Sequence, residues 1–221
     1  MTAKIDIGVL VSGSGSNLQS IIDNIEKGRL DARIRIVISN NPEAYALTRC
    51  RNHGIEAVVI RQEDHPDRES CDRAMVEVLK GKGVELVVMA GFMRLLSPFF
   101  LKAYPMRIMN IHPALLPAFP GLHVQKKAVE YGAKFSGCTV HFADEGVDTG
   151  PVIIQAVVPI LPDDTEDTLA ARILREEHKI YPQAIQWFAE GRIEVRGRQV
   201  RIRGVEQPKP VVLFNPPLEE R

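Results

Sequence analysis

The feature that most constrains the fold of this chain is a repeated alternation of apolar runs and amphipathic segments. Residues 5–11 are mostly apolar, residues 12–17 are rich in glycine and serine, and apolar residues then recur at helical spacing. The alternation predicts further strands at 34–38, 57–60, 84–90 and 108–112 and helices at 44–52 and 68–80. Because such strands form parallel sheets, we expect an α/β fold with a mostly parallel, twisted sheet and helices on both of its faces.

The regular alternation of strands and helices ends in the second half of the chain. A proline-rich loop at 113–121 precedes an expected helix near 124–131, and the runs at 137–142 and 152–158 resemble strands. We expect a long helix at about 165–188 and an exposed strand or hairpin at 192–203. The proline content after residue 204 predicts one domain over residues 1–204 and a loosely ordered tail over 205–221.

Composition excludes several classes of partner. Acidic and basic residues number 28 each in a chain of 221 residues, so no bulk positive field is available to bind nucleic acid or an anionic membrane. The chain has no apolar stretch of the roughly 20 residues that a membrane span needs, and it runs from its start directly into a strand. We therefore expect a cytoplasmic protein. The three cysteines are widely spaced, which argues against a disulfide framework and a metal site.

A polar pair ends the apolar run at residues 107–112. Asn110 and His112 are two apart, so in a strand they share a face, and Pro113 ends that strand. Asp148 follows in a glycine-punctuated loop, where a carboxylate could orient the imidazole. Two donors without a nucleophile suit acyl transfer by direct attack. The alternative is a strand end whose polar groups cap a nearby loop, with Asp148 forming a turn. His141 alternates with apolar neighbours and is expected to be a satisfied core or rim histidine.

The loop at residues 12–17 is a second candidate site. It lacks the Lys-Ser/Thr pair of a P-loop, and Leu18 occupies the position of the third glycine of a dinucleotide-binding loop. A glycine-rich turn that opens a helix can still hold one phosphate group with its backbone N–H groups. The alternative interpretation is a tight strand-to-helix turn with a serine cap.

Five segments together make the chain closely resemble the phosphoribosylglycinamide formyltransferase family. They are Ser12–Asn17, Ala90–Leu96, Asn110–Pro117, Pro120–His123 and Gly146–Pro151. The resemblance implies the Rossmann-like formyltransferase fold with an antiparallel addition near the C-terminus. It implies transfer of a formyl group from 10-formyltetrahydrofolate to the amine of glycinamide ribonucleotide in purine biosynthesis. These small molecules are the expected partners, no metal is expected, and Asn110, His112 and Asp148 match the catalytic trio of the family.

The resemblance also implies binding residues for each substrate. The phosphate and ribose of the ribonucleotide are expected on Gly15, Ser16, Asn17 and Glu177, although Glu176 is adjacent and equally acidic. The folate is expected against a set of residues drawn from three segments: Arg68, Met93, Arg94, Leu95, Leu96, Asp144, Glu145, Gly146 and Val147.

Three other functions use a similar core. A formyltetrahydrofolate deformylase would deliver the formyl group to water, but the deformylases that share this core have a longer chain with an N-terminal regulatory domain. A methionyl-tRNA formyltransferase would carry a C-terminal nucleic-acid-binding barrel, whereas only a short tail is expected here. A non-catalytic phosphate-ligand-binding protein on the same fold remains an alternative from a different class, since fold alone does not determine function.

Overall fold

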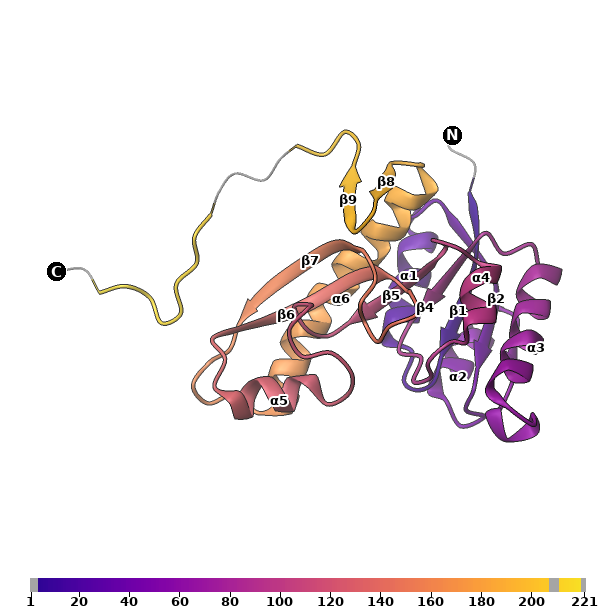
Figure 1. Ribbon diagram of the computed structural model, residues 1–221, viewed down its shortest axis with the longest axis horizontal. Coiled ribbons are helices and arrows are strands. Elements are labelled where there is room, and N and C mark those ends of the chain that lie inside the picture. Colours follow the sequence, from indigo (N-terminus) through magenta and orange to yellow (C-terminus); the bar gives the residue numbers. More distant parts are fainter. Residues whose placement is uncertain (1–3, 207–210, 220–221) are drawn as a thin grey trace.

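One twisted sheet of seven strands organises the computed structural model, which describes residues 4–206 and 211–219 (Figure 1). The strand order is β3-β2-β1-β4-β5-β6-β7. The first five strands along the chain are mutually parallel, and their bounds are Ile5–Val11 (β1), Ala32–Ser39 (β2), Ala57–Val59 (β3), Leu86–Met89 (β4) and Ile108–His112 (β5). The remaining two, β6 (Phe135–Phe142) and β7 (Val152–Pro159), are antiparallel. The expected mostly parallel sheet with an antiparallel addition is confirmed.

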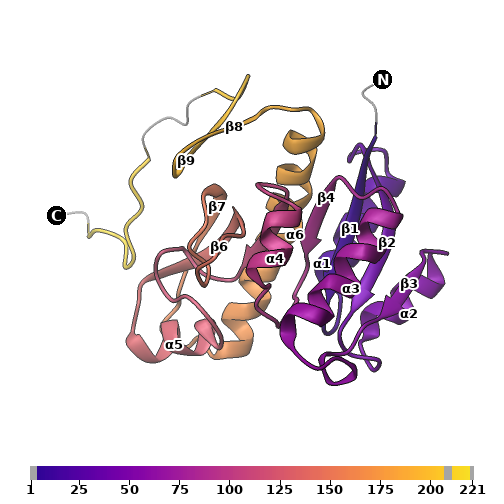
Figure 2. The same ribbon diagram turned by 45° about the vertical axis from the view of Figure 1, so that its right-hand side comes forward.

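Helices cover both faces of this sheet (Figure 2). One face carries α1 (Ser16–Glu26), α2 (Tyr45–Asn52), α5 (Val124–Tyr131) and α6 (Glu166–Ala189). The other carries α3 (Arg68–Gly81) and α4 (Pro98–Ala103), and the short 3-10 helix η1 (Gln62–Asp64) precedes α3. The division follows from connectivity. The chain runs from β1 through β2 to β3 at one edge of the sheet and then returns to β4 and β5 on the other side of β1. These two sets of crossovers run in opposite directions across the sheet, and because both are right-handed they lie on opposite faces.

Local signals explain where several helices begin. Asp67 and Ser70 form a capping box at the start of α3, and Thr165 and Thr168 do the same for α6. The pattern of apolar residues did not predict α4, which has only six residues. Its start is nevertheless encoded, because Ser97 accepts a hydrogen bond from the Phe100 N–H and Pro98 occupies the first turn.

A buried tyrosine joins α6 to the centre of the sheet. Tyr181 is fully buried, and its hydroxyl lies 3.0 Å from the carbonyl oxygen of Met89 and 2.9 Å from that of Met109. These two carbonyls belong to the adjacent strands β4 and β5. The hydroxyl therefore fixes the long helix against the strand ends beside which the candidate site lies.

The C-terminal part contains the hairpin expected at 192–203, formed by β8 (Ile193–Arg196) and β9 (Gln199–Ile202). The tail expected over 205–221 lies partly outside the described residues, and residues 211–219 form no helix or strand. Its Asn215 side chain donates to the carbonyl oxygens of Lys134 and Ile160. Within residues 4–206 and 211–219, none of the helices has both the length and the apolar character of a membrane span.

We expect Tyr181→Phe to lower the free energy of unfolding by about 1.5 kcal/mol, because the change deletes a buried hydroxyl and leaves its acceptors without that donor. Urea denaturation measures the difference. The control is Tyr131→Phe, whose ring is 81% exposed and whose loss of a hydroxyl should change stability by less than about 0.5 kcal/mol. Equal effects of the two substitutions would contradict the anchoring role of Tyr181.

Candidate active site

The candidate site lies at the edge of the sheet where β1, β4 and β5 end. These neighbouring strands are parallel, so their carboxyl ends share one edge, which is where open α/β sheets bind ligands. The segments after β1 and β4 are joined directly, because the Ser12 N–H donates to the Gly91 carbonyl over 3.1 Å and the Ser12 hydroxyl accepts from the Met93 N–H. Two hollows therefore lie side by side along one edge.

Asn110, His112 and Asp148 come together at the end of β5. The Asn110 Nδ2 atom lies 3.5 Å from Asp148 Oδ1, and the His112 Nδ1 atom lies 3.4 Å from Asp148 Oδ2. Residues two apart on a strand share a face, which is why one carboxylate contacts both side chains. The structure thus brings together the three residues expected to be catalytic, and their chemical roles stay a prediction.

The imidazole of His112 is held at both nitrogens. It is 4% exposed, and its Nε2 atom lies 2.9 Å from the carbonyl oxygen of Phe119 in the proline-rich loop. A carbonyl only accepts, so Nε2 carries a proton. Because the carboxylate of Asp148 on the other side is also an acceptor, the doubly protonated ring can donate to both partners.

His141 belongs to the site, although the sequence analysis did not assign it there. It is opposite Asn110 in the β5–β6 ladder, and its Nε2 atom lies 3.1 Å from Asn110 Nδ2. Its Nδ1 atom lies 2.9 Å from the Phe142 carbonyl oxygen and so carries the proton, which leaves Nε2 to accept from Asn110. Burial lowers the pKa of His141, which favours this neutral form. His141 is therefore satisfied, as expected, but by a residue of the candidate trio.

The loop that carries Asp148 is braced from within. Asp148 has a left-handed backbone, with φ 55°, a conformation that aspartate tolerates better than most residues. Its Oδ2 atom accepts from the Gly121 N–H over 2.9 Å. Asp144 crosses the loop and accepts hydrogen bonds from the Gly146 N–H and the Thr149 hydroxyl. These contacts fix where the Asp148 carboxylate points.

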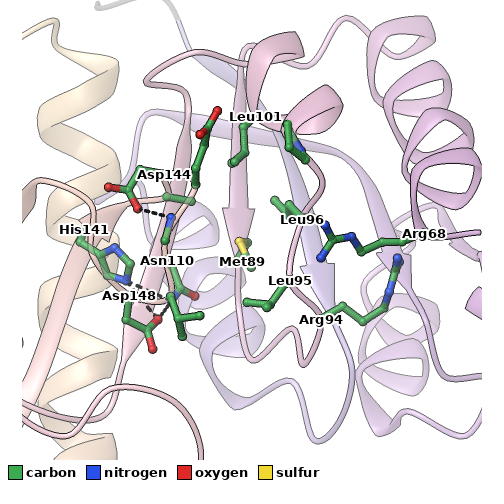
Figure 3. Close-up of a pocket in the computed structure, with 15 residues that line it drawn as sticks. Arg68, Met89, Arg94, Leu95, Leu96, Leu101, Asn110, His141, Asp144 and Asp148 are labelled. Atoms are coloured by element: carbon green, nitrogen blue, oxygen red, sulfur yellow. Dashed lines mark hydrogen bonds and ion pairs between the residues drawn. The ribbon is translucent and has the colours of Figure 1, made fainter.

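A cleft opens beside Asn110 and Asp148 (Figure 3). All of the residues expected to bind the folate line it except Met93, which lines the neighbouring hollow instead. Figure 3 shows Arg68 and Arg94 across the cleft from Asn110, Asp148 and His141. The apolar lining of the cleft also includes Met89, Pro98 and Leu101, which the resemblance did not suggest. His112 does not line the cleft.

Arg94 is bound to a carboxylate beneath this cleft. Its guanidinium donates to Asp72 Oδ1 over 3.1 Å and to the Gln62 side chain. Asp72 is fully buried, and its other oxygen accepts from the Ser97 N–H over 2.6 Å. A buried carboxylate needs such partners, so Arg94 fixes the segment that contributes Leu95 and Leu96 to the cleft.

The second hollow is lined by residues 12–17 together with Ala90, Gly91 and Met93. The carbonyls of this loop have partners outside the hollow: the Asn41 side chain donates to the Ser12 carbonyl, and the Ala46 N–H donates to the Gly13 carbonyl. Since a trans peptide points its C=O and N–H in opposite directions, the N–H groups paired with these carbonyls point away from Asn41 and Ala46, neither of which lines the hollow. Gly15, with φ 68°, begins α1 without a side-chain cap. This is the arrangement of an anion-binding nest.

Glu177 rather than Glu176 contacts a residue that lines this hollow. Its carboxylate accepts from Asn17 Nδ2 over 2.7 Å and is 6% exposed, whereas Glu176 pairs with Lys179. The Asn17 Oδ1 atom is buried and has no described partner. Burial raises the pKa of the Glu177 carboxyl, while the hydrogen bond from Asn17 opposes that rise. Among residues 4–206 and 211–219, no group of three or more histidine, cysteine or acidic side chains is placed to hold a metal ion.

Comparisons with known proteins agree with this geometry. The family model described as "Formyl transferase" matches residues 5–185. The chain is 42% identical over 204 residues to phosphoribosylglycinamide formyltransferase of Escherichia coli (strain K12), covering 92% of this chain and 96% of that protein. It is 49% identical to the trifunctional purine biosynthetic protein adenosine-3 of Drosophila melanogaster, over 84% of this chain and 14% of that much longer protein. The crystal structure of glycinamide ribonucleotide transformylase 1 from Symbiobacterium toebii superimposes with a TM-score of 0.89 at 53% identity, covering 90% of this chain and 94% of that one.

We expect Glu177→Gln to stabilise the fold more at pH 7.5 than at pH 4.5. Because its pKa is raised on folding, the Glu177 carboxyl binds its proton more tightly in the folded chain than in the unfolded chain. The free energy of unfolding of the wild type therefore falls as the pH rises from about 4.5 through the folded-state pKa of Glu177. A glutamine has no charge to bury, and its amide can donate to Asn17 Oδ1. Urea denaturation at both pH values measures the difference.

The matched control for this substitution is Glu176→Gln, whose carboxylate binds Lys179 on the outer side of α6. We expect no comparable gain at pH 7.5 from that change. A Glu177→Gln effect of the same size at both pH values would show that Glu177 does not titrate differently on folding.

Proposed function

The chain belongs to the formyl transferase family, and we propose that it transfers the formyl group of 10-formyltetrahydrofolate to the amine of glycinamide ribonucleotide. This is a step of de novo purine biosynthesis. The observation that carries the proposal is the position of Asn110 and Asp148, which line the cleft and stand at the same sheet edge as the anion nest of residues 12–17. A donor substrate and a phosphorylated acceptor can therefore meet at Asn110.

The residues of each hollow suit the substrate assigned to it. The cleft combines apolar walls from Met89, Leu95 and Leu96 with Arg68 at its edge, which fits a flat heterocycle that carries an anionic tail. The nest of Gly15, Ser16 and Asn17 offers backbone N–H groups to one phosphate, and Glu177 stands beside Asn17 as an acceptor for ribose hydroxyls. Asp144, Glu145, Gly146 and Val147 close the cleft on its polar side.

In the mechanism we propose, the substrate amine attacks the formyl carbon directly and no covalent enzyme intermediate forms. Asn110 donates to the oxyanion that develops, and His112 donates from Nε2 once the oxyanion takes the place of the Phe119 carbonyl. The new C–N bond forms as the carbonyl π-bond opens. On collapse, the bond to the folate nitrogen breaks, and that nitrogen receives a proton equivalent to the one lost by the amine.

Asp148 and His141 support this step without bonding to the reacting carbon. Asp148 orients the imidazole of His112 through its Nδ1 atom and orders the water that relays the proton between the two nitrogens. Neutral His141 accepts from Asn110 and so sets the orientation of the amide. We further propose that residues 1–204 act as one catalytic domain and that the protein works in the cytoplasm.

The wild-type chain tests the proposal when 10-formyltetrahydrofolate is supplied with and without glycinamide ribonucleotide and both folate absorbance and formate are followed. Turnover that requires the ribonucleotide and releases no formate is the expected result. Formate release that is independent of the ribonucleotide would instead identify a deformylase-type hydrolase. Absence of any reaction would favour a phosphate-ligand-binding protein.

We expect Asn110→Ala to lower kcat by about a hundredfold or more, because one oxyanion donor contributes about 3 kcal/mol to the transition state. Steady-state kinetics measure the loss, and urea denaturation checks that the variant is folded. Asn52→Ala, at the exposed end of α2, is the control and should keep wild-type kinetics. Near wild-type turnover of a folded Asn110→Ala variant would remove Asn110 from the mechanism.

A further inference from the structure

The anion nest has no positively charged residue in its lining. Its walls are residues 12–17, Ala90, Gly91 and Met93. A phosphate monoester carries a charge of about −1.5 to −2 near neutral pH, whereas a helix N-terminus supplies an equivalent of only about +0.5. The nest alone therefore compensates only part of the charge of the group assigned to it.

Arg49 on α2 lies directly behind the nest. Its Nε atom donates to the Ser14 carbonyl oxygen over 2.9 Å, and its NH1 atom donates to Gln19 Oε1 over 3.0 Å. Its guanidinium carbon lies 4.9 Å from the centre of the Tyr45 ring. These three partners are a carbonyl, an amide and an aromatic ring, so none of them neutralises the charge of Arg49.

The other polar groups near Arg49 have partners of their own. Gln19 is oriented by its own contacts, since its Nε2 atom donates to Asp23 Oδ1 over 2.8 Å and lies 3.1 Å from His53 Nε2. Asp23 therefore interacts with the amide of Gln19, and His53 pairs with Glu26. Arg49 also contributes to lowering the pKa of His178, after the larger effect of burial. A lowered pKa favours the neutral form of His178, although Asp23 acts in the opposite direction.

The bond to Ser14 also has a geometric consequence. In a planar trans peptide the carbonyl of Ser14 and the N–H of Gly15 point in opposite directions. Arg49 holds that carbonyl from the α2 side, and the Ala46 N–H holds the preceding carbonyl, of Gly13, in the same way. A Cβ at Gly15 would lie 2.6 Å from the Cβ of Ala46, so α2 packs tightly against the loop. The N–H of Gly15 consequently points away from Arg49, and Gly15 itself lines the nest.

We propose that Arg49 is the positioning residue through which this chain selects a phosphorylated acceptor. It aims the Gly15 N–H at the phosphate and supplies the positive charge that the lining of the nest lacks. The inference rests on the proposed function, because it takes the phosphate of the ribonucleotide to occupy the nest.

The test compares Arg49→Met with wild type on two acceptors, glycinamide ribonucleotide and its dephosphorylated riboside. We expect kcat/KM for the ribonucleotide to fall about tenfold through a higher KM, the size of one charge-assisted interaction. The value for the riboside and the KM for the folate should change less than twofold. Inorganic phosphate, used as a competitive inhibitor against the ribonucleotide, should bind the variant about tenfold more weakly.

Two further variants separate charge from structure. Arg51→Met is the matched control on the same helix, since Arg51 is exposed and its described hydrogen bond is to Thr48; it should match wild type in every assay. Arg49→Lys keeps the charge but not the double contact with Ser14 and Gln19, so it should recover part of the lost affinity for phosphate.

Two results would overturn the inference. Equal losses on the ribonucleotide and the riboside would show that Arg49 only supports the fold, and unchanged inhibition by phosphate would show that its charge does not reach the nest. Failure of the proposed function can be told apart from failure of this inference. In that case the wild-type chain itself would show no higher kcat/KM for the ribonucleotide than for the riboside.

Discussion

The site depends on one constraint, the register in which β6 pairs antiparallel to β5. That register sets His141 opposite Asn110, and the β6–β7 loop then brings Asp148 back over the end of β5. A shift by one residue would turn every side chain of β6 to the other face and would separate His141 from Asn110. The antiparallel addition to a parallel sheet is therefore what completes the group around Asn110.

The two hollows are held at a fixed spacing because their loops are hydrogen-bonded to each other. Ser12, at the end of β1, bonds through its N–H and its hydroxyl to the segment that follows β4. Tyr181 on α6 binds β4 and β5 through the carbonyls of Met89 and Met109. The spacing between the nest and the cleft is thus set by backbone and by two hydroxyls, those of Ser12 and Tyr181, so the position of one proposed substrate relative to the other does not depend on flexible side chains.

Much of this architecture can be predicted from the sequence, because strands and helices with strong periodicity specify themselves locally. The strand at 108–112 and the helix at 124–131 match their expected bounds, and the pairing of Asn110 with His112 follows from spacing alone. The contact between His141 and Asn110 could not be predicted, since strand register is a tertiary property. The same holds for the Phe119 carbonyl on His112 and for Arg49 behind the nest, because each joins segments that only the folded chain brings together.

The central claim is that the formyl group and the ribonucleotide meet at Asn110. A crystal structure of the protein with glycinamide ribonucleotide and a folate analogue whose one-carbon group cannot be transferred tests it most directly. We expect the phosphate on the backbone N–H groups of Gly15, Ser16 and Asn17, and the one-carbon group within hydrogen-bond reach of the Asn110 amide. A phosphate bound beside Arg68, or a one-carbon group held away from Asn110, would contradict it.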